Sequence, residues 1–325
     1  MDFKIRKATL KDTGKLVEAA STVYKINYFT RAKFQKMFLN PKVTSYIIAE
    51  KDESRIMGHV ALTNNKFKSA AEIGAAFVHS DYRNKGLLNI LTEHAIIEAE
   101  QSRINGVFVR AVCSHPYSQR AAFKHGLKDC TLLLSRHNEI LSSNKRESLL
   151  LAFRPLNKTN KTVLYIPRSH RKITGEIYRN FDIEPVFCDG EASFMNKTVL
   201  EVEKNEHFKT AAINIMHAGL DFVKKIDSEV RKLRRKNYIS ILALLNSTNP
   251  STIYLGRYLL SNGFFFSGVM PGYHNAHILV LQSISNYEID FDNIQIDSEI
   301  GNKLLNHIRA TAPITQKQKE LVIHG

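Results

Sequence analysis

The stretch FVHSDYRNKGLLNIL, from Phe77 to Leu91, decides how the first part of the chain is read. It opens with an apolar run, continues through a polar, basic turn with one glycine, and becomes apolar at helical spacing. This pattern predicts a strand, a turn and a helix. The first N–H groups of a helix have no intrahelical partner, and the helix dipole adds positive charge there. The stretch therefore predicts a site for an anion at the start of the helix.

The turn itself supplies Arg83, Asn84, Lys85 and Gly86. Arg83 and Lys85 add full positive charges, and Gly86 lets the backbone approach a bulky anion closely. The spacing is neither that of a Walker loop nor that of the dinucleotide-binding fingerprint. The residues thus outline a pyrophosphate site, with an ordinary strand–helix turn as the alternative.

Composition sets the broad class. The chain has 325 residues, of which 43% are hydrophobic and 24% are charged, so we expect a globular protein with two domains of ordinary size. No apolar run is long enough to cross a membrane, and the N-terminus lacks the apolar segment of a signal peptide. We therefore expect a cytoplasmic location and no membrane partner.

Two further properties limit the partners. Cys113, Cys130 and Cys188 lack the spacing of a zinc site, so we expect neither a disulfide framework nor a metal. The net charge of +15 favours anionic partners, which include nucleic acid, a membrane surface or a polyanionic cofactor.

Periodicity predicts the element order β-α-α-β-β-β-α-β-α-β-β up to Pro155, a mixed α/β domain. The polar segment LNKTNK, residues 156–161, is a plausible linker. From about Lys209 the order seen between Ala71 and Pro155 repeats. We expect two domains, 1–157 and 162–325, each with a mixed, mostly antiparallel sheet flanked by helices. Two fused copies can replace a dimer, so we expect a monomer.

At this point the chain resembles the GNAT superfamily of N-acetyltransferases, over Met1 to about Leu156. The segment YRNKGLL matches the family's Arg/Gln-x-x-Gly-x-Gly/Ala loop at Arg83 and Gly86, and departs from it at Leu88. The segments IRKATLKD, RIMGHVAL and SQRAAFKHGL are also similar to family segments. The resemblance implies acetyl-CoA as co-substrate, with its pyrophosphate held on the loop and on Leu87 and Leu88.

The resemblance also implies the other contacts of the coenzyme. Backbone groups near Phe77, Val78 and His79 would bond the pantetheine arm and stabilise charge on the thioester oxygen. Ser118 would flank the coenzyme where the family often has Asn.

Acetyl transfer requires a neutral amine, so a base must take the proton of the incoming ammonium group. Glu72 has the offset from Gly86 that the resemblance implies for the general base, and a solvated glutamate at a strand start is the alternative. The family's usual acid, a tyrosine, is replaced by Ala122. Tyr117 and His115 are candidates for a group near the sulfur, with packing or capping roles as alternatives.

The leading hypothesis is an N-acetyltransferase that transfers acetyl from acetyl-CoA to an amine on a small molecule or a protein. The second is a protein of the same fold that senses acyl-CoA without turnover. A nucleic-acid binder ranks last, because no basic strand rich in aromatic residues is present. The second half lacks the basic glycine loop and has Asp221 at the corresponding place, so we expect it not to bind coenzyme.

Overall fold

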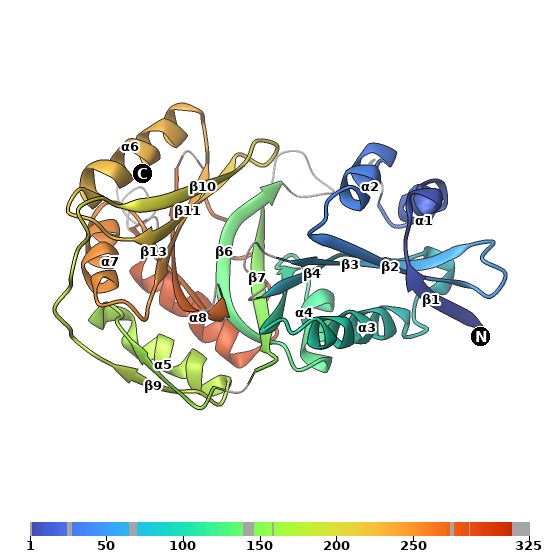
Figure 1. Ribbon diagram of the computed structural model, residues 1–325, viewed down its shortest axis with the longest axis horizontal. Helices are drawn as coiled ribbons and strands as arrows, with labels where there is room; N and C mark the ends of the chain where they lie inside the picture. Colours follow the sequence, from blue (N-terminus) through green and yellow to red (C-terminus); the bar gives the residue numbers. More distant parts are fainter. Residues whose placement is uncertain are drawn as a thin grey trace.

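The computed structural model describes residues 2–24, 28–64, 70–138, 146–157, 159–273, 276–285 and 287–313. The elements up to β7 form its first half, and those from β8 onward form its second half (Figure 1). The elements of the first half are β1 (Phe3–Lys7), α1 (Thr13–Ser21), α2 (Arg31–Phe38), β2 (Val43–Glu50), β3 (Ile56–Asn64), β4 (Ala71–Val78), α3 (Leu87–Gln101), β5 (Gly106–Val112), α4 (Tyr117–Lys124), β6 (Lys128–Asn138) and β7 (Arg146–Pro155).

The second half follows with a comparable mixture of strands and helices. Its elements are β8 (Lys161–Leu164), α5 (Arg171–Asn180), β9 (Glu184–Phe187), β10 (Val199–Asn205), β11 (Thr210–His217), α6 (Phe222–Arg235), β12 (Ser240–Asn246), α7 (Ser251–Ser261), β13 (Phe265–Tyr273), β14 (Ala276–Ile284) and α8 (Glu299–Thr311).

The strands form one 12-stranded sheet in the order β1-β2-β3-β4-β5-β7-β6-β13-β14-β12-β11-β10. Within the described residues, β4 with β5 and β11 with β12 are parallel, and the other neighbours in this sheet are antiparallel. A separate parallel pair joins β8 to β9. The expected mixed, mostly antiparallel sheet flanked by helices is confirmed.

The two halves share one connectivity. In β4-α3-β5-α4-β6-β7 the first two strands are parallel, and the last strand lies between the second and third. The segment β11-α6-β12-α7-β13-β14 has the same order and the same pairing. Strand β10 and helix α8 are absent from the sequence prediction. The exposed edge strand β10 carries mainly polar side chains, which masks its alternation.

Alternating side chains of the first half bury two separate layers. Ile47 packs in a cluster with Leu16 of α1 and Phe34 of α2, whereas its neighbour Ile48 packs with Leu91 of α3. Successive residues of a strand point to opposite faces, so α1 and α2 cover one face of the sheet and α3 covers the other (Figure 1). Strand β4 therefore lies between two helical layers.

The halves join where β13 approaches β6. Gly268 of β13 pairs with Thr131, and a Cβ on Gly268 would lie 2.4 Å from the carbonyl oxygen of Cys130. The buried side chain of Gln282 bonds both backbone groups of Leu134, at 3.0 Å and 2.7 Å. Sheet pairing and a buried amide thus fix the halves to each other.

We predict that Gly268→Ala weakens this junction. The methyl group collides with backbone at a φ of +141°, so we expect the free energy of unfolding to fall by about 3 kcal/mol, as measured by urea denaturation. Gly263→Ala is the matched control, because its φ is +81° but nothing lies within 4 Å of the added carbon. Gly263→Ala should lower the free energy of unfolding by about 1 kcal/mol. Equal decreases for both variants would contradict this role of Gly268.

Candidate functional site

Strand β4 separates from β5 after a short stretch of pairing. Among the described residues the two strands pair at Ala71 with Val107 and at Glu72 with Phe108, although β4 continues to Val78. The register between β3 and β4 shifts, and Ala75 has a φ of +49°. An extra residue in one strand bends it away from its neighbour. The result is a wedge between β4 and β5.

His59 of β3 holds this bulge in place. The side chain is fully buried, and its Nδ1 lies 2.8 Å from the carbonyl oxygen of Ala75. Burial lowers the pKa of His59 to about 4, so the ring is neutral near pH 7 and Nδ1–H is the donor to that oxygen. The ring also stacks on Phe77, with centroids 5.4 Å apart.

The end of β4 presents alternating backbone groups. The N–H of His79 bonds Met57 of β3 at 2.9 Å, and the C=O of His79 accepts from Tyr82 at 3.0 Å. Successive residues of a strand direct their backbone groups to opposite neighbours, so the N–H of Val78 faces the wedge. The structure therefore offers Val78 as the donor there, while His79 is engaged within the protein.

The turn after β4 is anchored on both sides. The buried Tyr82 donates its hydroxyl hydrogen to Glu50, and Asp81 pairs with Arg55 at 2.9 Å. Beyond this anchor, Asn84 and Gly86 have φ values of +61° and +76°. These left-handed residues turn the chain into α3, and glycine adopts that conformation at little cost.

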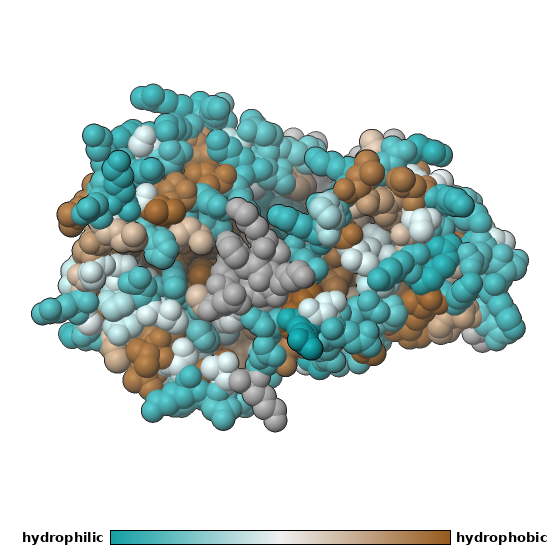
Figure 2. Space-filling model, viewed as in Figure 1, coloured by the Kyte–Doolittle hydropathy of each residue, from teal (hydrophilic) through white to brown (hydrophobic). Residues whose placement is uncertain are grey.

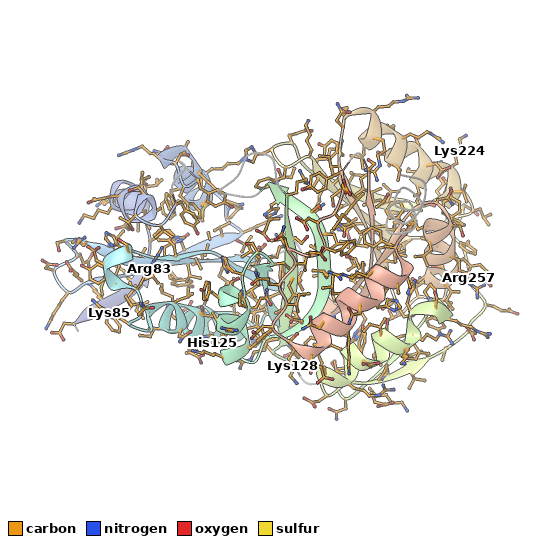
Figure 3. All side chains as sticks on the ribbon, turned by 180° about the vertical axis from the view of Figure 1, so that it is seen from behind. Arg83, Lys85, His125, Lys128, Lys224 and Arg257 are labelled. Carbon is orange, nitrogen blue, oxygen red and sulfur yellow. The ribbon has the colours of Figure 1, made fainter. Side chains whose placement is uncertain are left out.

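The start of α3 is uncapped. Gly86 is its N-cap. Among the described residues, no side chain caps this end, and nothing lies within 4 Å of the position that a Cβ on Gly86 would take. Arg83 and Lys85 are exposed beside it, as Figure 3 shows. Leu87 is buried and Leu88 is partly buried, so their side chains anchor the helix while their N–H groups stay at its start. The site fits a phosphate or pyrophosphate.

Glu72 lies where the wedge begins, and it is not a free carboxylate. Its two oxygens lie 3.1 Å and 3.0 Å from Nη1 of Arg110 on β5, and the side chain is about one quarter exposed, at 25%. Sequence reasoning missed Arg110, because the alignment of β4 with β5 brings the two residues together and no local pattern records it.

An aromatic wall covers β4 on the side of α1 and α2. Tyr24, Tyr28, Phe29 and Phe77 form a chain of ring contacts with centroid distances between 5.0 and 6.4 Å. The hydroxyl of Tyr24 donates to the carbonyl oxygen of Ala76 at 3.4 Å, and burial raises the pKa of Tyr24 to about 12. Of these four residues, the sequence pointed to Phe77 but not to Tyr24, Tyr28 or Phe29.

Helix α4 brings a different set of groups. Tyr117 is 73% exposed and its ring lies 5.1 Å from that of His115, so the described contacts do not join it to Glu72. The hydroxyl oxygen of Ser118 is buried and has no hydrogen-bond partner in the described part of the chain. A buried hydroxyl of this kind can receive a ligand. Ala122 is buried in the core beneath α3.

The corresponding turn of the second half is filled by its own chain. The N–H of Gly219 donates to Oγ1 of Thr198 at 3.0 Å, and Asp221 accepts from the N–H of Thr198 at 2.7 Å. A Cβ on Gly219 would lie 2.2 Å from the backbone carbon of Lys197. The space that the first half keeps open at Gly86 is therefore occupied here by backbone.

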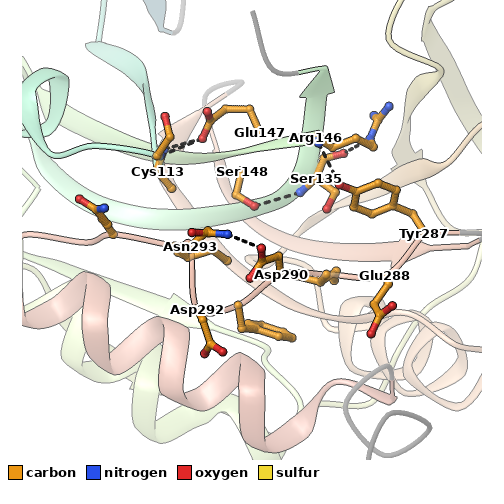
Figure 4. A pocket seen from close by; sticks show the side chains of 15 residues that line it. Cys113, Ser135, Arg146, Glu147, Ser148, Tyr287, Glu288, Asp290, Asp292 and Asn293 are labelled. Carbon is orange, nitrogen blue, oxygen red and sulfur yellow. Dashed lines mark hydrogen bonds between the residues drawn. The ribbon is translucent and has the colours of Figure 1, made fainter. Parts of the chain in front are cut away.

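A cavity of about 810 Å³ lies between β7 and the segment 287–295 (Figure 4). Its lining includes the carboxylates of Glu147, Glu288, Asp290 and Asp292, against the single basic side chain of Arg146. Glu147 accepts from the N–H groups of Cys113 and Ser114, which fixes its position. This cavity is unsuited to a polyphosphate, because most of its charges are negative.

Comparison with protein families matches residues 14–127 to the acetyltransferase (GNAT) family. The match runs from α1 to the end of α4 and includes the wedge and the turn before α3. Residues 14–127 of the chain thus resemble a GNAT acetyltransferase domain. A comparison with curated proteins gives no match.

Solved structures similar to the chain include three acetyltransferases. The ribosomal-protein-S18-alanine N-acetyltransferase from Escherichia coli is 13% identical, with a TM-score of 0.42, covering 48% of this chain and 96% of its own. An N-acetyltransferase from Staphylococcus aureus Mu50 is 15% identical, with a TM-score of 0.42 and coverages of 48% and 100%. A GNAT-family acetyltransferase from Streptococcus pneumoniae is 18% identical, with a TM-score of 0.40 and coverages of 48% and 100%.

No described helix is long and apolar enough to cross a membrane. No group of three or more His, Cys, Asp or Glu side chains in the described residues is arranged to hold a metal ion.

We predict that His59 makes stability depend on pH. Its pKa in the folded protein, about 4, lies below the usual 6.5, so its contribution is present above pH 6.5 and is lost as pH falls through 4. His59→Asn keeps a donor for Ala75 but does not titrate. Between pH 7 and pH 4 the wild type should lose about 3 kcal/mol more unfolding free energy than the variant. Parallel losses in urea denaturation would show that His59 does not titrate in this way.

Proposed function

We propose that the chain is an acyl-CoA-dependent N-acyltransferase that transfers acetyl from acetyl-CoA to an amine, with one working site in the first half. One observation carries the proposal: the open, uncapped start of α3, flanked by Arg83 and Lys85, lies directly after the strand that separates from β5. The match of residues 14–127 to the acetyltransferase family supports the same reading.

The residues present fit the coenzyme. The N–H groups from Gly86 to Asn89 would bind the pyrophosphate, with Arg83 and Lys85 adding charge. The pantetheine arm would lie in the wedge against the backbone of Val78, and Phe77 would pack behind it. The unpartnered hydroxyl of Ser118 would bond the coenzyme from α4.

The coenzyme supplies an acetyl thioester, and the chain supplies the groups that act on it. Glu72 would take a proton from the ammonium group of the acceptor, directly or through a water molecule. The neutral amine then attacks the carbonyl carbon, so that a C–N bond forms, the C–S bond breaks and the nitrogen gives up its extra proton to water or to the departing thiolate. The N–H of Val78 is placed to stabilise negative charge on the carbonyl oxygen.

The leaving thiolate has three candidate donors. Tyr117 and His115 are the candidates from the sequence, but in this structure both residues are exposed. Tyr24 is the alternative, because its hydroxyl lies at the Ala76 carbonyl on the edge of the wedge. A thiolate is a fair leaving group, so a hydrogen bond from Tyr24 would be sufficient without full proton transfer.

We further propose that residues 162–325 form a diverged copy of the same domain that binds no coenzyme. The repeated connectivity supports the copy, and the packing of Lys197 and Thr198 on Gly219 supports its inability to bind. Its role would be to form one wall of the acceptor site.

We predict that Arg83→Ala weakens acetyl-CoA binding about tenfold, because the pyrophosphate loses one charge-assisted contact. Calorimetric titration should give one site per chain in the wild type. Arg257→Ala is the matched control, since Arg257 is exposed on α7 at the far end of the molecule (Figure 3). Absence of binding to the wild type would remove both the enzyme and the sensor hypotheses.

We predict that Glu72→Gln lowers kcat at pH 7 by about 100-fold or more and leaves the affinity for acetyl-CoA unchanged. The defect should shrink as pH rises, because the free amine then becomes available without a base. Glu93→Gln, on the exposed side of α3, serves as the control. An unchanged kcat would rule out Glu72 as the base, and binding without turnover of any amine in the wild type would favour the sensor.

A further inference from the structure

A cavity of about 270 Å³ lies between the two halves of the sheet. Arg110, Arg136 and His137 line it from β5 and β6, and Glu203 and Lys204 line it from β10. Figure 2 shows the surface hollowed between the lobe that contains α2 and the lobe that contains β10, with hydrophilic side chains around the hollow. Both halves are therefore needed to form this cavity.

The cavity begins at the proposed catalytic base. Arg110 lines the cavity and at the same time bonds Glu72, with Nη1 3.0 Å from one carboxylate oxygen. A molecule in the cavity thus lies beside the Arg110–Glu72 pair and next to the wedge between β4 and β5.

Arg136 is the unusual residue of the lining. Its Nη1 donates to the carbonyl oxygens of Ala211 and Ser240, both at 3.2 Å. In the described part of the chain, Nε and Nη2 of Arg136 make no hydrogen bond, and no carboxylate lies within 4.0 Å of its guanidinium group. Arg136 is partly buried, and charged side chains that are withdrawn from water are usually paired with an opposite charge.

The charges that act on Arg136 are mostly positive. Burial lowers the pKa of Arg136 to about 9, and the charges of Arg110 and Arg146 act in the same direction. Glu203 opposes them, and Arg110 is already paired with Glu72. His137 stays neutral near pH 7, because burial and the neighbouring cations lower its pKa to about 3. An anionic group in the cavity would relieve this excess of positive charge.

We propose that this cavity is the acceptor site and that the acceptor is a small amine whose other end carries a carboxylate or a phosphate. Arg136 binds the anionic end through its free N–H groups, and the amine end reaches Glu72. The guanidinium group has the geometry to hold either anion through two hydrogen bonds. This assignment rests on the proposed acetyltransferase function.

The size of the cavity favours a small molecule. Ligand pockets commonly enclose about 300 to 1,000 Å³, and the volume of this cavity, about 270 Å³, lies just below that range. A short amino acid or an aminoalkyl phosphate fits that volume, and the surface of a folded protein does not enter it.

The test compares amines of similar length that differ in charge. The probes are propylamine, 3-aminopropanoate, 4-aminobutyrate and 2-aminoethyl phosphate, and thiol release from acetyl-CoA is measured. In the wild type, kcat/KM for at least one anionic amine should exceed that for propylamine by about tenfold or more. The carboxylate and phosphate probes then distinguish the two anions.

Arg136→Gln should lower kcat/KM for the preferred anionic amine by about tenfold or more and leave that for propylamine unchanged. Arg136→Lys should recover part of the loss, because it restores the charge without the planar fork. Arg257→Gln removes a surface charge of α7 and should change neither rate. Acetyl-CoA affinity, measured by calorimetry, and urea denaturation show whether the variants are folded.

Three results would overturn the proposal. They are equal rates for propylamine and the anionic amines, an equal loss for both classes in a folded Arg136→Gln variant, and no turnover of any probe by a wild type that binds acetyl-CoA. Failure of acetyl-CoA itself to bind is a different result, because it removes the proposed function rather than the acceptor class.

Discussion

The bulge in β4 is the constraint on which the rest of the site depends. His59 bonds the carbonyl oxygen of Ala75 at the register shift of β4, and the pairing of β4 with β5 in the described residues lies before that shift. The wedge exposes backbone groups that a continuous sheet would consume, and it leads directly to the uncapped start of α3. A single buried, neutral histidine therefore links the core of the sheet to the groups that would bind the coenzyme.

The second half contributes by closing the other side. Its sheet continues that of the first half through β13, and Gln282 ties the two together at Leu134. The turn before α6 is filled by the backbone of Lys197 and Thr198. The start of α3 thus stays open while the corresponding turn is closed, and in the proposed function the second half would form a wall of the acceptor site.

The sequence predicted the first half well because its signals are local. The helical spacing, the glycine and the basic residues predict the turn from Arg83 to Gly86 and the helix after it. The structure contains both. The pairing of Glu72 with Arg110 depends on how β4 and β5 align. The hydrogen bonds of Arg136 depend on how the two halves pack against each other. These are long-range contacts, which periodicity does not record. The engagement of His79 by Met57 and Tyr82 was missed for the same reason.

The most direct test of the central claim is amide hydrogen exchange with and without acetyl-CoA. We predict slower exchange in residues 77–91, where the N–H groups of Val78 and of the start of α3 would bind the coenzyme. We predict no change in residues 217–227, where Thr198 and Asp221 already close the corresponding turn. Slower exchange at the start of α6 on adding acetyl-CoA, or unchanged exchange at the start of α3, would contradict the proposed coenzyme site.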